Sequence, residues 1–194
     1  QQENNMNLAV DKKYNLKNLK DMSSHLEDIE YFIFFGTLLG YHRNNDIIEW
    51  DDDIDFYVNI NHKNDIINIL VTLNLDISID HPYFVQGTRV IDNIRTYVDF
   101  YFYENSPDKD YILERWNFHG QSDNEVSHLH IPKNYIYPIS EGKMGNIDFK
   151  VPNNIESCCK FLYGEKYNFP LKKGIDYVIS CNNNKPVIIY RNGV

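Results

Sequence analysis

The residues with the clearest chemical potential are the acidic run at positions 50–55, WDDDID. In a β-strand, alternate side chains project from one face and lie about 6.5–7 Å apart along the strand. Asp51, Asp53 and Asp55 would therefore share a face if the strand extends that far, with Asp52 on the other side. Unpaired, so many like charges would disfavour ionisation, whereas hard cations such as Mg²⁺ or Mn²⁺ take carboxylate ligands. The run therefore predicts a site for one or two divalent cations.

Asp99 is the candidate for a third acidic ligand, because it stands alone in an apolar, β-prone segment at residues 95–103. A carboxylate in a central strand needs a partner, since burying an unpaired charge is expensive. The alternatives to a metal are a position at the sheet rim or an ion pair with Arg95, which would share its strand face. We favour the metal role.

A solvated acidic loop and a calcium loop are the simpler explanations of residues 50–55. The calcium loop requires a glycine after its third aspartate and a glutamate at its closing position, and neither follows Asp55. Ile54 and Phe56 are apolar, which argues against a solvated loop. An Asp-x-Asp pair alone is a weak motif, so the segment that precedes it matters.

That preceding segment, residues 31–35, is predicted to be a buried strand that ends in a glycine turn. Gly36 permits a tight turn with the backbone close to a ligand. The N–H groups that follow, together with the Thr37 hydroxyl, suit a phosphate at the start of a short helix. Taken alone, these residues are explained more simply by an ordinary strand-to-helix turn.

Hydrophobic periodicity outlines the elements that must position these residues. Apolar residues at three- and four-residue steps predict a first helix over residues 12–30, and alternation predicts a strand over 53–60. The other expected elements are a helical turn over 37–43, a loop over 44–46, a helix over 62–73, a strand over 95–103, a helix between 152 and 164 and an edge strand over 186–190. We expect a flexible segment over residues 1–10 and one domain over 11–194.

Composition limits the classes of function. The chain has 194 residues, of which 42% are hydrophobic and 14% aromatic, and this suits one packed domain. A formal net charge of −9, without a run of lysine or arginine, disfavours nucleic-acid binding. No apolar stretch approaches the roughly 20 residues of a membrane span. Three cysteines, two of them adjacent, make no disulfide framework, so we expect a cytoplasmic protein. The oligomeric state is left open, and a chain that starts at Gln1 could be a piece of a larger protein.

Together these motifs resemble the LicD/fukutin family, which includes bacterial phosphocholine transferases and fukutin-type ribitol-phosphate transferases. The resemblance rests on residues 35–40, FGTLLG, on Arg43, on residues 50–55 and on a later strand with Asp99. It covers roughly residues 14–170. It implies an α+β fold, a nucleotidyltransferase-like mixed β-sheet flanked by helices in a single domain, with the motif core at residues 31–103.

The chain departs from the family pattern between the arginine and the tryptophan, and again after the third acid. Where the family usually has a glycine and then an apolar-proline pair, this chain has residues 44–46, NND, and 48–49, IE. Where the family often has a proline, residues 101–103 read YFY. These changes affect loop shape and substrate fit but remove no expected metal ligand, so we expect an active site.

The resemblance also implies roles for individual residues. Asp53, Asp55 and Asp99 are the expected catalytic residues and metal ligands, with Asp51 as a further ligand, in a site for two Mg²⁺ or Mn²⁺ ions. Asp99 also suits the general base that accepts a proton from a hydroxyl nucleophile.

The residues expected to bind substrate or phosphate are Gly36, Thr37, Arg43 and Trp50. The planar guanidinium of Arg43 suits phosphate oxygens, although a surface salt bridge to Asp46 or Glu49 is nearly as good an explanation. Trp50 is expected to pack beneath the site, with stacking on a nucleotide base as the alternative.

The implied reaction is the transfer of a phospho-alcohol group, of the polyol phosphate or phosphocholine type, from a CDP-activated donor to a glycan hydroxyl, releasing CMP. The expected partners are therefore a nucleotide-activated small molecule and a glycan. One alternative is a nucleotidyltransferase that uses a nucleoside triphosphate and shares the metal site. The other is a noncatalytic nucleotide- or glycan-binding module, against which the retained aspartates argue.

Overall fold

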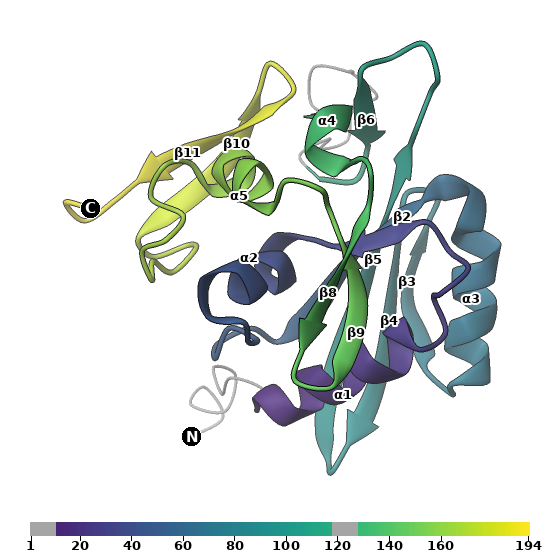
Figure 1. The fold of residues 1–194 in the computed structure, drawn as a ribbon. Helices are drawn as coiled ribbons and strands as arrows, with labels where there is room; N and C mark the ends of the chain where they lie inside the picture. The colour runs from purple at the N-terminus through teal and green to yellow at the C-terminus, as the bar shows by residue number, and fades with distance from the viewer. Residues whose placement is uncertain (1–10, 118–127) are drawn as a thin grey trace.

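The computed structural model describes residues 11–117 and 128–194, so the segment 1–10 that was expected to be flexible lies outside the described residues. The chain folds into a mixed β-sheet flanked by helices, in one domain, as the sequence predicted (Figure 1). The elements are α1 (Lys12–Ser23), β1 (Tyr31–Ile33), α2 (Phe35–Asn44), β2 (Asp53–Asn59), the 3₁₀ turn η2 (Ile60–His62), α3 (Lys63–Thr72), β3 (Asp76–His81), β4 (Phe84–Ile91), β5 (Ile94–Glu104), β6 (Tyr111–Glu114), β7 (Leu129–Pro132), α4 (Lys133–Ile136), β8 (Ser140–Met144), β9 (Ile147–Val151), α5 (Ile155–Tyr163), β10 (Tyr177–Asn182) and β11 (Lys185–Tyr190).

Among the residues that the structure describes, the main sheet has seven strands. Five of them follow the order β1-β2-β5-β4-β3, while β6 pairs with β5 and with β7. The strands β2 and β5 run parallel, and the other pairs described in this sheet are antiparallel. Because β5 lies between β2 and β4, Asp99 is on a central strand, as the sequence predicted. Two hairpins, β8–β9 and β10–β11, form separate two-stranded sheets.

The helices cover the sheet with fully buried apolar side chains, such as Leu19 and Met22 of α1 and Ile66 of α3. A Cβ atom at Gly87 of β4 would lie 2.8 Å from a methyl carbon of Leu70, so the glycine lets α3 approach the sheet closely. Figure 1 shows α2, α5 and the β10–β11 hairpin grouped on the side of the sheet away from α3. Within the described residues, no helix is long and apolar enough to cross a membrane.

The first helix is shorter than the predicted range of 12–30, because α1 ends at Ser23. The hydroxyls of Ser23 and Ser24 donate to backbone carbonyls of the last turn, at 3.3 and 2.9 Å, and such local bonds compete with continued helix. The chain then runs through turns to β1, yet Leu26 and Ile29 remain buried. Beyond Ser23, the apolar spacing therefore indicates buried residues in turns and does not indicate a continuing helix.

The boundary between β1 and α2 also differs from the prediction. The strand expected over 31–35 ends at Ile33, and the expected short turn is a ten-residue helix that already begins at Phe35. Phe35 has φ +48°, a conformation that bulky residues rarely adopt, so this junction is locally strained. The helix ends at Asn45 in the left-handed conformation.

The other predicted elements are confirmed with small changes at their ends, namely β2, α3, β5, α5 and β11. The helix α5 starts as expected, because the Asn154 side chain accepts a hydrogen bond from the Ser157 N–H, and it ends at Gly164. The hairpin β3–β4 was not predicted. Its second strand contains Gly87, which sequence rules treat as a strand breaker, whereas here it makes room for α3.

Candidate active site

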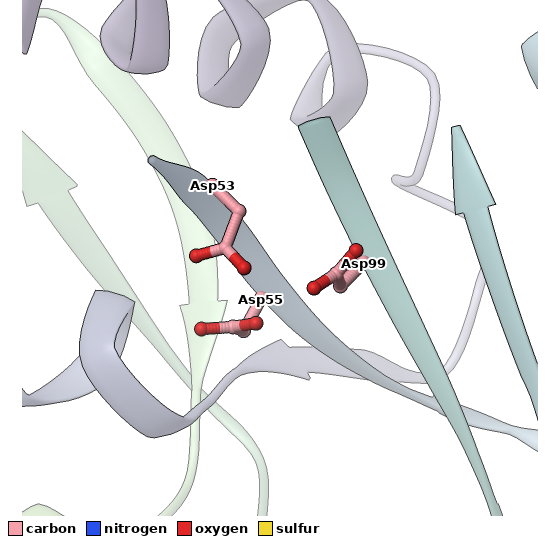
Figure 2. A group of neighbouring side chains, drawn as sticks. All are labelled: Asp53, Asp55 and Asp99. Atoms are coloured by element: carbon pink, nitrogen blue, oxygen red, sulfur yellow. The ribbon is translucent and has the colours of Figure 1, made fainter. Parts of the chain in front are cut away.

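The parallel pairing of β2 and β5 brings three carboxylates together. In this register Asp55 lies opposite Asp99, and Asp53 lies opposite Tyr97. Because side chains two residues apart share a strand face, Asp53 and Asp55 both point toward the carboxylate of Asp99 (Figure 2). One oxygen from each carboxylate lies within 4.8 Å of the other two. The structure thus assembles, from two strands, the three aspartates that the sequence singled out.

Burial and mutual repulsion make these carboxylates reluctant to ionise. Burial raises the pKa of Asp53, and the neighbouring charges of Asp55 and Asp99 raise it further. Burial likewise raises the pKa of Asp55, with Asp99 adding to the effect. The pKa of Asp99 is raised by burial too, although hydrogen bonds from Asp53 and Gln86 oppose the rise. Three ionised carboxylates held this closely need a compensating positive charge.

A divalent cation fits this donor set. Hard cations prefer carboxylate oxygens, and acids from two adjacent strands can converge on one or two of them. A bound cation would turn the repulsion among Asp53, Asp55 and Asp99 into attraction. The chemistry of the three residues therefore suits Mg²⁺ or Mn²⁺.

Neighbouring side chains hold the aspartates in place. Gln86 of β4 donates from Nε2 to Asp99 Oδ1 at 2.9 Å. The Tyr101 hydroxyl donates to Asp55 Oδ1 at 3.3 Å. The backbone N–H of Asp55 donates to the Thr37 hydroxyl oxygen at 2.9 Å, which ties β2 to α2. These contacts fix the orientation of the carboxylates without neutralising them.

Sequence reasoning missed Gln86 and Tyr101. Gln86 lies on β4, a strand that was not predicted, and only the strand register places it beside Asp99. Tyr101 could have been found, because a residue two positions after Asp99 shares its strand face. The alternative partner, Arg95, instead donates from Nη1 to the Thr88 hydroxyl at 3.4 Å.

Asp51 is not one of the three carboxylates whose oxygens lie within 4.8 Å of one another, although it lines the same cavity as Asp53 and Asp55. The strand β2 begins at Asp53, so the alternation on which its predicted position depended does not reach Asp51. Its carboxylate packs against the start of α2, where a Cβ atom at Gly36 would lie 2.6 Å from Asp51 Oδ2. Burial raises the pKa of Asp51 to about 7, with a further contribution from Asp52. Gly36 is therefore required for this close approach.

Thr37 is buried, and its hydroxyl oxygen accepts the hydrogen bond from Asp55 described above. It contributes no part of the cavity beside the carboxylates. The structure therefore gives Thr37 a place in positioning β2, which differs from the phosphate contact expected of it.

Arg43 and Trp50 both line that cavity. Asp46, the alternative partner of Arg43, pairs with Lys12 at 3.0 Å. Trp50 is 40% exposed, so it does not pack beneath the site. The Lys172 ammonium lies 5.6 Å from the centre of its ring.

The cavity has a volume of about 550 Å³, which is large enough for a small-molecule substrate. The acidic side chains that line it are Asp51, Asp52, Asp53 and Asp55. The basic side chains are Arg43, Lys172 and Lys173, and the tyrosines are Tyr101, Tyr163 and Tyr177. Acidic and basic groups thus share one cavity, as a site for a metal-bound anion requires.

The fold is that of nucleotidyltransferases, and the family to which the sequence belongs supports a transferase. The sequence matches the LicD/FKTN/FKRP nucleotidyltransferase domain over residues 28–154, so the chain belongs to that family. The match lies within the range of the resemblance noted in the sequence. Membership indicates phosphotransferase-type activity.

Two solved structures resemble the chain in fold. Antibiotic-resistance factor ANT(2'')-Ia has a TM-score of 0.50 and 11% identity, covering 74% of this chain and 66% of that protein. Lincosamide antibiotic adenylyltransferase LnuA, bound to lincomycin, has a TM-score of 0.48 and 14% identity, covering 73% of this chain and 80% of that protein. At such low identity, the likeness concerns the fold alone. No functionally curated protein matches the sequence.

Proposed function

We propose that the protein is a metal-dependent transferase that moves a phospho-alcohol group, of the polyol phosphate or phosphocholine type, from a CDP-activated donor to a glycan hydroxyl. The observation that carries this proposal is the mutually repelling group Asp53, Asp55 and Asp99, of which Asp53 and Asp55 line a cavity that basic residues also line. The family supports a nucleotide-type donor and a sugar acceptor.

The aspartates are the proposed ligands of Mg²⁺ or Mn²⁺, which would supply charge neutralisation and polarisation of the phosphoryl group. Tyr101 keeps one oxygen of Asp55 oriented, and Thr37 holds the Asp55 backbone. Gln86 orients Asp99 in the same way. Most of the rate enhancement would then come from positioning and electrostatics, because phosphoryl transfer needs little covalent help from a protein.

In the proposed reaction, the acceptor hydroxyl oxygen attacks the distal phosphorus of the donor diphosphate. A new oxygen–phosphorus bond forms while the bond from that phosphorus to the bridging oxygen breaks. CMP leaves with the bridging oxygen and its electron pair, and a carboxylate oxygen of Asp99 accepts the hydroxyl proton. Arg43 is the proposed contact for phosphate oxygens, because its guanidinium can donate two parallel hydrogen bonds.

Product analysis with a panel of donors tests this proposal. The protein is incubated with Mg²⁺ or Mn²⁺, CDP-alcohols or nucleoside triphosphates, and simple sugars, and the released CMP and pyrophosphate are measured. We expect metal-dependent CMP release that is lost in Asp53→Asn and Asp55→Asn. An Asp148→Asn variant serves as the matched control, because Asp148 is an exposed aspartate on the β8–β9 hairpin.

Two other results would contradict the proposal. Pyrophosphate release from a triphosphate, with no CMP from any CDP-alcohol, would assign nucleotidyl transfer instead. Nucleotide binding without turnover of any donor would favour a noncatalytic binding module.

A further inference from the structure

Part of the cavity lining comes from a stretch of the chain beyond the family match, which ends at residue 154. Its basic residues are Lys172 and Lys173, in the loop between α5 and β10. The hairpin β10–β11 contributes apolar lining residues, including Ile179 and Pro186. The site is therefore built from two separate stretches of sequence.

Backbone hydrogen bonds close the loop that carries the two lysines. The N–H of Lys172 donates to Asp176 Oδ2 at 2.7 Å, and the N–H of Asp176 donates back to the Lys172 carbonyl at 2.8 Å. The N–H of Gly174 donates to the Tyr177 carbonyl at 2.7 Å. Arg191, just after β11, donates its N–H to the Asp176 carbonyl at 2.7 Å. The backbone positions of both lysines are thus fixed relative to the hairpin.

Both ammonium groups remain available to a ligand. Among residues 11–117 and 128–194, neither lysine forms an ion pair, whereas Lys12, Lys63 and Lys160 each pair with a carboxylate. Both side chains are exposed at the cavity.

Each lysine faces a part of the acidic side of the cavity. Lys173 lines the cavity together with Asp53 and Asp55. Burial raises the pKa of Asp55, and the positive charge of Lys173 partly opposes this rise. Lys172 lies over the ring of Trp50, which is itself at the cavity. The two cations therefore flank the space between the aspartates and an exposed aromatic ring.

We propose that Lys172 and Lys173 bind the diphosphate of the nucleotide donor, opposite the three aspartates, so that residues 155–194 are part of the active site. This inference rests on the proposed function, because it identifies how that site holds a nucleoside diphosphate. Two ammonium groups suit a diphosphate, because one divalent cation bound by three carboxylates keeps no net positive charge and two such cations keep only one. As the donor bond breaks, negative charge grows on the leaving phosphate, and nearby fixed cations stabilise it. An indole face at the same wall suits stacking by a base.

Calorimetric titration of the full chain with CDP and with inorganic pyrophosphate, each with Mg²⁺, tests this inference without turnover. We expect the double variant Lys172→Gln, Lys173→Gln to bind both ligands about tenfold more weakly, since each lost charge-assisted bond weakens binding. The salt dependence of binding should also decrease. The Lys172→Arg, Lys173→Arg variant should retain most of the affinity, because it preserves both charges.

Lys185→Gln is the matched control, because Lys185 is an exposed lysine of the same C-terminal stretch that does not line the cavity. Its affinity should equal that of the unchanged protein. The inference is overturned if the double variant binds within twofold of the unchanged protein. It is also overturned if Lys185→Gln weakens binding equally, or if the unchanged protein binds neither ligand. The proposed function is judged separately by CMP release and its loss in Asp53→Asn, so either idea can fail alone.

Discussion

Glu114 and the group Asp53, Asp55 and Asp99 differ in what surrounds their carboxylates. At Glu114 of β6, every neighbour that affects the carboxyl opposes the effect of burial. Tyr57 and the side chain of Asn117 donate to one of its oxygens, and the N–H groups of Trp116 and Asn117 donate to the other. At Asp53, the neighbouring carboxylates add to the effect of burial.

This contrast separates a carboxylate that stabilises the fold from carboxylates that are proposed to bind a cation. Glu114 is satisfied by donors of its own chain and holds Asn117 at the cavity edge. The aspartates have few protein donors and no matched cation within hydrogen-bonding reach in the described residues. A fold tolerates such repulsion where function requires it, because a substrate or metal supplies the missing charge.

The largest expected effect is the loss of activity in Asp55→Asn. The amide removes a charged ligand at the centre of the three carboxylates, so metal-dependent turnover should fall on the order of 10³-fold. Unfolding in urea without divalent metal should show equal or higher stability, because one source of repulsion is gone. Turnover is measured as CMP release and stability from the urea curve.

A clear loss of metal-free stability in Asp55→Asn would contradict the distinction between Asp55 and Glu114. It would mean that the Asp55 carboxylate stabilises the fold as Glu114 does. The Asp148→Asn control should change neither turnover nor the urea midpoint.

The next largest effect is the loss of stability in Glu114→Gln. The substitution keeps the shape of the side chain but turns one acceptor into a donor that faces existing donors. The free energy of unfolding near neutral pH should therefore fall by about 1–3 kcal/mol. Calorimetric affinity for Mg²⁺ should stay within twofold, because the aspartates are unchanged.

The exposed Glu141 provides the control, and Glu141→Gln should leave the urea midpoint unchanged. If Glu114→Gln unfolded at the same urea concentration as the unchanged protein, Glu114 would not be the structural member of the pair.

The acidic site was predictable because its signal is local. Alternation within residues 53–59 defines one strand face, and a lone Asp99 in an apolar run points to a second, central strand. The parallel register that sets Asp55 opposite Asp99 needs the three-dimensional pairing, but the strand types sufficed to propose that they meet.

The other residues around the site were not predictable, because their positions depend on contacts that are distant in the sequence. Gln86 depends on β4, whose Gly87 hides the strand pattern, and Glu114 depends on loop backbone that folds back onto it. Lys172 and Lys173 lie in an irregular loop, where periodicity carries no signal about which side chains reach the site. Long-range packing, and not local preference, decides these positions.

A smaller effect on turnover is expected from Tyr101→Phe, which removes one hydrogen bond to Asp55. Loss of the hydroxyl frees Asp55 Oδ1 from the donor at 3.3 Å and relaxes its orientation. Turnover should fall about two- to tenfold, with the larger change in kcat, because one neutral hydrogen bond contributes about 0.5–1.5 kcal/mol. Tyr135→Phe, at a tyrosine of α4 that does not line the cavity, should leave turnover unchanged. Equal activity in Tyr101→Phe and the unchanged protein would remove Tyr101 from the site.

The last effect concerns the pH dependence of stability at Glu114. Burial raises its pKa above the ordinary value of 4.5, and the hydrogen bonds only partly offset this. Between pH 4.5 and the folded pKa, the folded state holds a proton that the unfolded state has already released. The stability that this proton contributes is therefore full below pH 4.5 and is lost as pH rises through the folded pKa.

Glutamine does not titrate, so the stability difference between the unchanged protein and Glu114→Gln should be largest at low pH and shrink as pH rises. The aspartates titrate in both proteins, and their effect cancels in this difference. Urea unfolding of both proteins from pH 4.5 to 7 measures it, with a slope of at most about 1.4 kcal/mol per pH unit. A difference that grew with pH would show that the donors around Glu114 outweigh its burial, which would make the contrast with the aspartates larger.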